Sequence, residues 1–154
     1  MKDEKVEHIH KRHNKTLLLY HVVCPTKYRR KVVKRERSKY FKEICLEIGE
    51  KYEIHFIEIG ADEDHIHFLV QSVPMFRPKD IVQTIKSITA RKMFEQYPEM
   101  KKELWGSSFW GSGYYMNTVC KYGNVEMIKK YVEQQGKKYS QIHRGQLTLF
   151  VGLE

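Results

Sequence analysis

Two pairs of residues in this sequence have the types and the spacing to cleave a phosphodiester. His65 and His67 flank Ile66 in an apolar stretch, and side chains two apart on a strand point to the same face. Neutral imidazoles bind Mn, Zn, Ni or Cu readily and Mg less readily. Tyr131 and Gln135 stand four apart in a predicted helix, so they share one helix face. Together the two pairs offer two metal ligands, a candidate third metal ligand and a phenolic nucleophile. This set suits cleavage through a covalent tyrosine intermediate.

Each pair also has an ordinary structural interpretation. Two histidines often lie on the surface of a sheet, and Tyr131 lies beside an apolar helix stripe, where it can simply pack. A free phenol is almost fully protonated near pH 7, so Tyr131 needs a metal, a cation or a base nearby to become a nucleophile. On spacing alone, Gln134 offers a carbonyl oxygen to a metal as well as Gln135 does.

An acidic segment, residues 62–64, precedes the two histidines. Turn chemistry alone explains an acidic hairpin tip, but Asp64 is also a candidate to orient a metal-binding histidine from behind. A second His-x-His motif, His8-Ile9-His10, lies in a polar, basic stretch without strand character. We therefore favour His65 and His67 as the metal ligands.

The composition favours a polyanionic partner. Lys and Arg number 28 against 19 Asp and Glu, which gives a net charge of +9, and aromatic residues make up 12% of the chain. Cations beside stacking faces are typical of single-strand nucleic-acid binding. No apolar run approaches the roughly 18 residues of a membrane-spanning helix. With three cysteines, no CxxC spacing and no secretion signal, we expect reduced thiols in a cytoplasmic protein.

The apolar periodicity predicts an α+β fold in the order β-α-β-β-α-β, the ferredoxin-like or RRM-like antiparallel sheet, with a C-terminal helix that carries Tyr131. The predicted strands are 16–23, 52–59, 65–71 and 114–119, and the predicted helices are 36–51, 79–97 and one from Asn124 past Gln135. We expect one domain over 16–138, a mobile basic tail over 1–15 and a C-terminal tail over 139–154.

Four motifs follow one another along residues 17–138. They are Lys27-Tyr28-Arg29-Arg30, Asp64-His65-Ile66-His67-Phe68-Leu69, the Trp- and Gly-rich stretch from Leu104 to Tyr115, and Ile128-Lys129-Lys130-Tyr131 with Gln135. In this order and at this spacing, the chain resembles the small tyrosine transposases of insertion sequences, the TnpA type of the HUH (His-hydrophobic-His) single-strand endonucleases. Cys120 departs from the glycine common there in the family, but it lies outside the motifs.

The resemblance implies a homodimer of ferredoxin-like subunits that binds a hairpin at each end of a single-stranded DNA element. It implies cleavage that leaves a 5′-phosphotyrosine and a free 3′-OH, followed by rejoining without nucleotide hydrolysis. By the same resemblance, His65 and His67 hold Mg or Mn, Gln135 rather than Gln134 is the third ligand, and Tyr131 is the nucleophile. The tyrosine helix of one subunit can complete the metal site of the other.

Two further segments are candidates for binding. In the basic loop, Lys27, Arg29 and Arg30 suit contacts to the DNA backbone and Tyr28 suits stacking, although the segment is equally typical of a solvated loop. The tail Gln146-Leu147-Thr148-Leu149-Phe150 is similar to the pentapeptide with which bacterial proteins dock on the replication sliding clamp. A terminal strand that packs on the dimer is the alternative for this tail.

Two other functions remain open at this point. A non-catalytic RRM-like RNA-binding module explains the charge and the aromatic residues, but it leaves His65, His67, Tyr131 and Gln135 to chance. Another HUH enzyme, either a repeat-associated tyrosine transposase or a replication initiator, shares the chemistry and differs in its DNA target.

Overall fold

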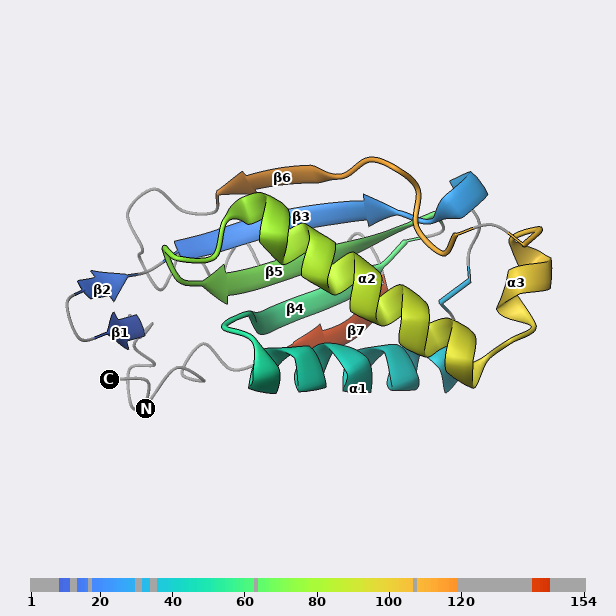
Figure 1. The fold of residues 1–154 in the computed structure, drawn as a ribbon, viewed down its shortest axis with the longest axis horizontal. Coiled ribbons are helices and arrows are strands. Elements are labelled where there is room, and N and C mark those ends of the chain that lie inside the picture. The colour runs from blue at the N-terminus through green and yellow to red at the C-terminus, as the bar shows by residue number, and fades with distance from the viewer. Residues whose placement is uncertain are drawn as a thin grey trace.

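A five-stranded antiparallel sheet forms the centre of the protein (Figure 1). The computed structural model describes residues 9–11, 14–16, 18–29, 32–33, 36–62, 64–106, 108–118 and 140–144. The strand order is β6-β3-β5-β4-β7. The strands are β3 (Leu18–Pro25), β4 (His55–Ala61), β5 (His65–Ser72), β6 (Tyr115–Thr118) and β7 (Ser140–Arg144), and a separate hairpin joins β1 (Ile9–Lys11) and β2 (Asn14–Thr16).

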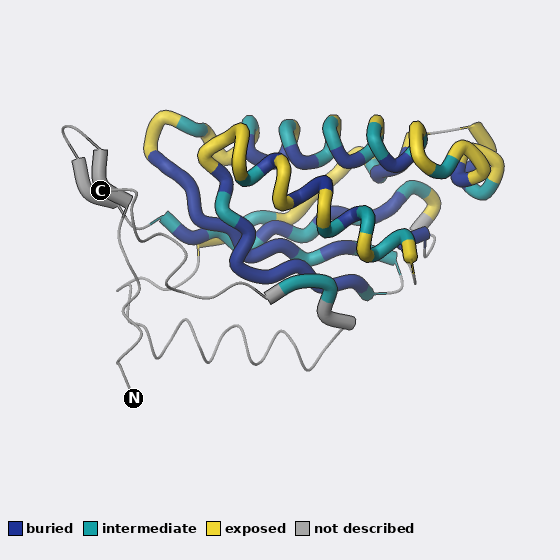
Figure 2. Tube along the Cα trace, turned by 90° about the horizontal axis from the view of Figure 1, so that it is seen from below, coloured by how far each residue is buried: buried dark blue, intermediate teal, exposed yellow. Residues whose placement is uncertain are grey.

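Two long helices, α1 (Glu36–Lys51) and α2 (Pro78–Gln96), lie side by side over one face of this sheet (Figures 1 and 2). Both have apolar residues at helical spacing, and these turn toward the strands. Phe41 of α1 stacks near Phe68 of β5, with 6.1 Å between ring centroids. Buried residues concentrate between helices and sheet, so the core occupies this layer (Figure 2).

Short elements complete the described part. The 3-10 turn η1 (Lys27–Arg29) follows β3, and the four-residue helix α3 (Met100–Glu103) follows α2. Pro78 begins α2, where its missing N–H costs nothing. Among the described residues, no helix is long and apolar enough to cross a membrane.

The predicted α+β fold and its element order are confirmed. Helix 36–51 is observed as predicted, and the other predicted elements of residues 16–119 agree within three residues at each end. The helix predicted from Asn124 lies outside the described residues. Residues 1–15, expected to be a tail, contain β1 and most of β2. Residues 139–154, also expected to be a tail, contain the whole of β7.

The thiols of Cys24 and Cys45 are free and buried in the core. Burial raises the pKa of Cys24 to about 12 and the pKa of Cys45 well above its usual range. Both thiols are therefore poor nucleophiles. Cys120 lies outside the described residues.

Candidate functional site

The sheet face opposite α1 and α2 carries three histidines, which we call the histidine cluster. In the antiparallel pair of β3 and β5, Val22 lies opposite Phe68, and both side chains belong to the core. Successive side chains on a strand point to opposite faces. His21 of β3 therefore shares the outer face with His65 and His67 of β5.

The ring of His67 lies in contact with the rings of both His65 and His21. The ring centroids of His65 and His67 are 4.6 Å apart. His21 stacks on His67 with 5.3 Å between centroids and 17° between ring planes. Its Nε2 atom lies 3.0 Å from Nδ1 of His67, a hydrogen-bond distance. The strand pairing thus brings together two histidines that the sequence pattern predicted and one that it did not.

Asp64 contacts His65 in the way expected of a residue that orients a metal ligand. Its Oδ1 atom lies 2.6 Å from Nδ1 of His65, so an N–H at that position donates to the carboxylate. The carboxylate of Asp62 lies 3.5 Å from Nε2 of the same ring. Asp64 is therefore more than the acidic tip of a hairpin.

The Nδ1 atoms of His65 and His67 both face polar partners, Asp64 and His21 respectively. Metal-binding histidines typically donate one ring N–H to such a partner and present the other nitrogen to the ion. The cluster fits two ligands of a divalent ion through Nε2. Within the part of the chain that the structure describes, no three His, Cys, Asp or Glu residues are arranged to hold a metal.

The basic loop joins the histidine strand directly. The backbone N–H of Thr26 donates to the carbonyl of Asp64 at 3.0 Å, and that of Lys27 donates to the carbonyl of Phe109 at 2.9 Å. Tyr28 is 51% exposed, and Nζ of Lys27 lies 5.5 Å from its ring centroid. These contacts fix the loop beside the end of β5 where His65 stands.

Several predicted site residues are not placed. Arg29 belongs to η1, but its side chain is not described, and Arg30 lies outside the described residues. The same is true of the predicted nucleophile, the third ligand and the docking tail, which are Tyr131, Gln135, Gln146, Leu147, Leu149 and Phe150.

Two residues near the site were missed by the sequence interpretation. His21 looked like part of a buried strand, and only the register with β5 places it beside His67. Trp105 was noted as part of a motif, but the sequence did not indicate that its ring contacts Tyr28, 77 positions earlier. The alternation along β3 could have predicted the position of His21. Leu19, His21 and Val23 alternate with the core positions of this strand, so they belong to its outer face.

Comparison with known proteins points to one family. The family model described as IS200-like transposase matches residues 14–135. The ISDra2 transposase TnpA of Deinococcus radiodurans is 33% identical over 121 residues, which cover 79% of this chain and 86% of that protein. The transposase for insertion sequence element IS200 of Salmonella typhimurium is 30% identical over 116 residues, 75% of each chain.

A solved structure agrees with the sequence relatives. A crystal structure described as that of a transposase from Deinococcus radiodurans R1 superimposes with a TM-score of 0.67 at 28% identity. The match covers 82% of this chain and 96% of the other. The fold of this chain is therefore similar to that of a transposase along most of its length.

Proposed function

Since the chain belongs to the IS200-like transposase family, we propose that it binds hairpin ends of single-stranded DNA and cleaves and rejoins the strands through a 5′-phosphotyrosine. The observation that carries this proposal is the histidine cluster. His65 and His67 present neighbouring rings on an outer sheet face, with Asp64 at Nδ1 of His65. This arrangement matches the contact by which a carboxylate orients a metal-binding histidine.

The donor set suits a divalent ion such as Mg or Mn. His65 and His67 would hold it through Nε2, and Gln135 would add a carbonyl oxygen, as the family resemblance implies. When bound, the ion would supply Lewis acidity at the scissile phosphate and stabilise charge on the departing 3′-oxygen. Asp64 favours the tautomer of His65 that leaves Nε2 for the ion. When Nε2 of His21 is the acceptor, it supports the same tautomer of His67.

Tyr131 is the proposed nucleophile. Its phenolic oxygen forms a bond to phosphorus as the bond from phosphorus to the 3′-oxygen breaks, and the 3′-oxygen leaves as a hydroxyl once it gains a proton. The phosphotyrosine keeps the energy of the broken ester. A 3′-OH from another strand can therefore reverse the step and release the phenol, without nucleotide hydrolysis.

One assay tests this function. The full chain is incubated with single-stranded DNA that carries a hairpin end, together with Mg or Mn, and examined for a denaturant-stable protein–DNA adduct. We expect an adduct from the native chain and none from Tyr131→Phe. Tyr122→Phe and Tyr139→Phe are matched controls that keep the adduct. Absence of an adduct with every end sequence of the element would favour a nucleic-acid-binding module without catalysis.

The proposed assembly is a homodimer that acts at the nucleoid, and its tail provides a docking segment. Residues 146–150 are similar in sequence to the pentapeptide with which bacterial proteins bind a groove on the sliding clamp. A pull-down with the clamp compares the native chain with a triple variant, Leu147→Ala, Leu149→Ala and Phe150→Ala. Equal recovery of the clamp by both chains would rule out this docking.

A further inference from the structure

Two exposed aromatic rings from distant parts of the sequence meet at one end of the molecule. Tyr28 of η1 and Trp105, which follows α3, lie with 5.2 Å between ring centroids and 47° between ring planes. Tyr28 is 51% exposed and Trp105 is 68% exposed. Large aromatic side chains usually gain stability by burial, as Trp110 does at 5% exposure. The exposed pair gains little in that way and calls for another explanation.

Both residues adopt an unfavourable backbone conformation. Among the described residues, Tyr28 and Trp105 are the non-glycine positions with positive φ, at 56° and 53°. A bulky residue there costs on the order of 1–3 kcal/mol, and such strain concentrates at ligand-binding sites. Gly106, at φ 72°, continues the same left-handed turn without that cost. Two strained positions that present their rings to one another indicate a site that is built for a ligand.

The two backbone segments are held firmly in place. Lys27, next to Tyr28, donates its N–H to the carbonyl of Phe109 at 2.9 Å. The N–H of Trp105 donates to the carbonyl of Lys102 at 3.1 Å, and the N–H of Gly106 to that of Lys101 at 2.6 Å. The backbone that carries both rings is therefore ordered before any ligand arrives, which reduces the entropy cost of binding.

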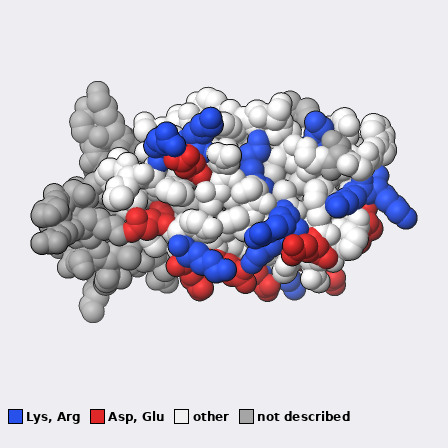
Figure 3. Space-filling model, viewed as in Figure 1, with Lys and Arg blue, Asp and Glu red and all other residues white. Residues whose placement is uncertain are grey.

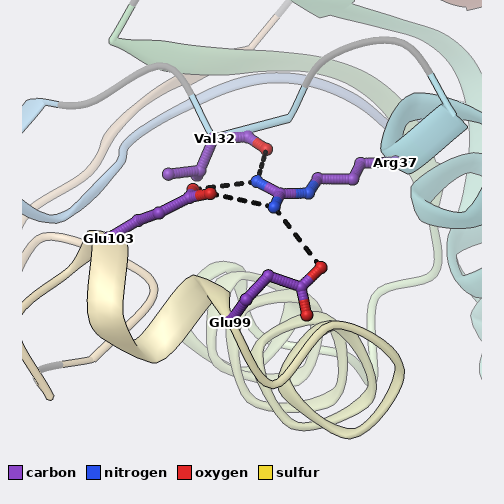
Figure 4. A network of polar contacts seen from close by, with 4 residues as sticks. All are labelled: Val32, Arg37, Glu99 and Glu103. Atoms are coloured by element: carbon purple, nitrogen blue, oxygen red, sulfur yellow. Dashed lines mark hydrogen bonds and ion pairs between the residues drawn. The ribbon is translucent and has the colours of Figure 1, made fainter.

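A salt-bridge network also fixes α3 (Figure 4). Arg37 of α1 donates to both carboxylate oxygens of Glu103 at 2.9 Å, and to the carbonyl of Val32 at 3.3 Å. The carboxylate of Glu99 lies 3.6 Å from the same guanidinium. Because Glu103 stands two residues before Trp105, this network positions the turn that presents the indole ring.

Lys27 borders the aromatic pair, and α3 adds two exposed lysines beside Glu99 and Glu103, which pair with Arg37. Nζ of Lys27 lies 5.5 Å from the ring centroid of Tyr28, and Lys101 and Lys102 are exposed on α3. Lys and Arg side chains lie at the α3 end of the molecule (Figure 3). A flat apolar face beside cations complements a nucleotide, whose base stacks while its phosphate meets positive charge. An apolar peptide would match the rings but not the lysines.

We propose that Tyr28 and Trp105 form a stacking site for one unpaired base of single-stranded DNA, which we call the aromatic platform. This inference rests on the proposed function, because it takes DNA as the substrate. Thr26, two residues before Tyr28, donates its backbone N–H to the carbonyl of Asp64. Asp64 directly precedes β5, so the platform lies toward the end of β5 that carries His65. The platform accepts any base, since every base has a stackable face.

Tryptophan fluorescence tests the platform in the full-length chain. The chain has two tryptophans, and the exposed Trp105 responds to solution ligands while the buried Trp110 does not. We expect a short single-stranded oligonucleotide to quench the exposed emission. An abasic strand of equal charge should quench much less. Unchanged emission at a saturating concentration of the oligonucleotide would overturn the proposal.

Affinity measurements with substituted chains complete the test. Trp105→Leu and Tyr28→Leu should each weaken binding of the base-bearing oligonucleotide about 5- to 150-fold, the equivalent of one lost stacking contact. Trp105→Phe should retain most of the affinity, because a phenyl ring still stacks. Tyr52→Leu is the matched control, since Tyr52 is a 40% exposed tyrosine in the turn after α1. An equal loss of affinity for the abasic strand would contradict base stacking.

The outcomes separate the platform from the proposed function. If Trp105→Leu weakens binding but still forms the tyrosine adduct at saturating DNA, both proposals stand. If the native chain shows quenching but no adduct, the platform stands and the catalytic proposal fails. If the adduct forms but Trp105→Leu binds as tightly as the native chain, the platform fails alone.

Discussion

The Nδ1 atoms of His65 and His67 meet different partners, and this difference determines what each partner contributes. Asp64 offers a carboxylate and directly precedes His65 in the chain, with 2.6 Å between Oδ1 and Nδ1. His21 is neutral when it accepts from His67, and it comes from a neighbouring strand, at 3.0 Å. The second contact depends on the register of β3 against β5, so the fold itself sets the orientation of one proposed metal ligand.

Removing His21 should weaken metal binding without removing a ligand. In His21→Ala, Nδ1 of His67 loses the contact with Nε2 of His21 that helps to orient its ring. We expect Mn affinity to fall about 10- to 100-fold, as for other residues that support a metal ligand from behind. Titration of Mn(II) followed by electron paramagnetic resonance measures this change directly. His55→Ala, which removes an imidazole from β4, is the control, and an equal loss in that variant would contradict the role of His21.

At the scale of elements, the salt bridge between Arg37 and Glu103 fastens α3 to α1. The bond to Glu103 is the main cause that raises the pKa of Arg37, and nearby Glu99 adds to it. In Arg37→Lys, an ammonium group replaces the planar guanidinium. The ammonium cannot reproduce both bonds to Glu103 together with the bond to the carbonyl of Val32. We expect the free energy of unfolding to fall by about 1–3 kcal/mol.

Urea unfolding of Arg37→Lys checks this value. The matched control is Arg77→Lys, because Arg77 pairs with Asp80 at 2.8 Å on the exposed start of α2. We expect no measurable change in the control, since solvent screens such a pair. A stability loss of similar size in both variants would show that α3 does not depend on the network.

Strand β7 should respond to mild acid through His143. Its Nε2 atom bonds to the carbonyl of Phe56 at 3.1 Å. Burial lowers the pKa of His143 and nearby Lys42 adds to the lowering, while the bond to Phe56 acts in the opposite direction. The unfolded chain therefore binds this proton more readily than the folded chain. Stability should fall as the pH drops through about 6.5, the ordinary histidine value, and the loss is complete below the lowered pKa.

Urea unfolding at pH 7.5 and pH 5.5 measures this effect. His143→Gln keeps an N–H donor but has no group that titrates in this range. We expect a smaller difference between the two pH values in the variant than in the native chain. If the difference is the same in both chains, other groups are responsible.

These elements also show how far the sequence could predict the site. The alternation of β5 was enough to place His65 and His67 on one face, and the apolar period of α1 was enough to give its length. Helix α3 has four residues, too few for a period, and its partner Arg37 lies 66 positions before Glu103. Contacts of that range depend on tertiary packing, which a local pattern does not contain.

For the whole molecule, the net charge of +9 predicts that DNA binding depends strongly on salt. Each phosphate contact to a single strand contributes about −0.7 to the slope of log affinity against log salt concentration. Lys27→Gln should therefore reduce the magnitude of that slope by about 0.7 and weaken all sequences alike. Lys51→Gln, at the exposed end of α1, is the control. A changed sequence preference in Lys27→Gln would indicate a contact to a base instead.

The complete active site is predicted to form between two chains. The described residues contain the histidine cluster, and the proposed third ligand and nucleophile, Gln135 and Tyr131, lie outside them. The family resemblance implies that the tyrosine helix of a partner subunit can supply them. We therefore expect that His67→Ala and Tyr131→Phe, each inactive alone, recover adduct formation when co-expressed, because the mixed dimer contains one intact site.

The identity of the labelled chain makes this test decisive. The two variants carry tags of different size, so a denaturing gel shows which chain bears the DNA. If the site forms in trans, the adduct appears on the His67→Ala chain, which keeps its tyrosine and uses the partner's histidines. Co-expression of His67→Ala with a chain that carries both substitutions should give none. If the mixed dimer forms but stays inactive, the histidines and the tyrosine of one chain act together, and the sheet and the tyrosine helix must then meet within a subunit.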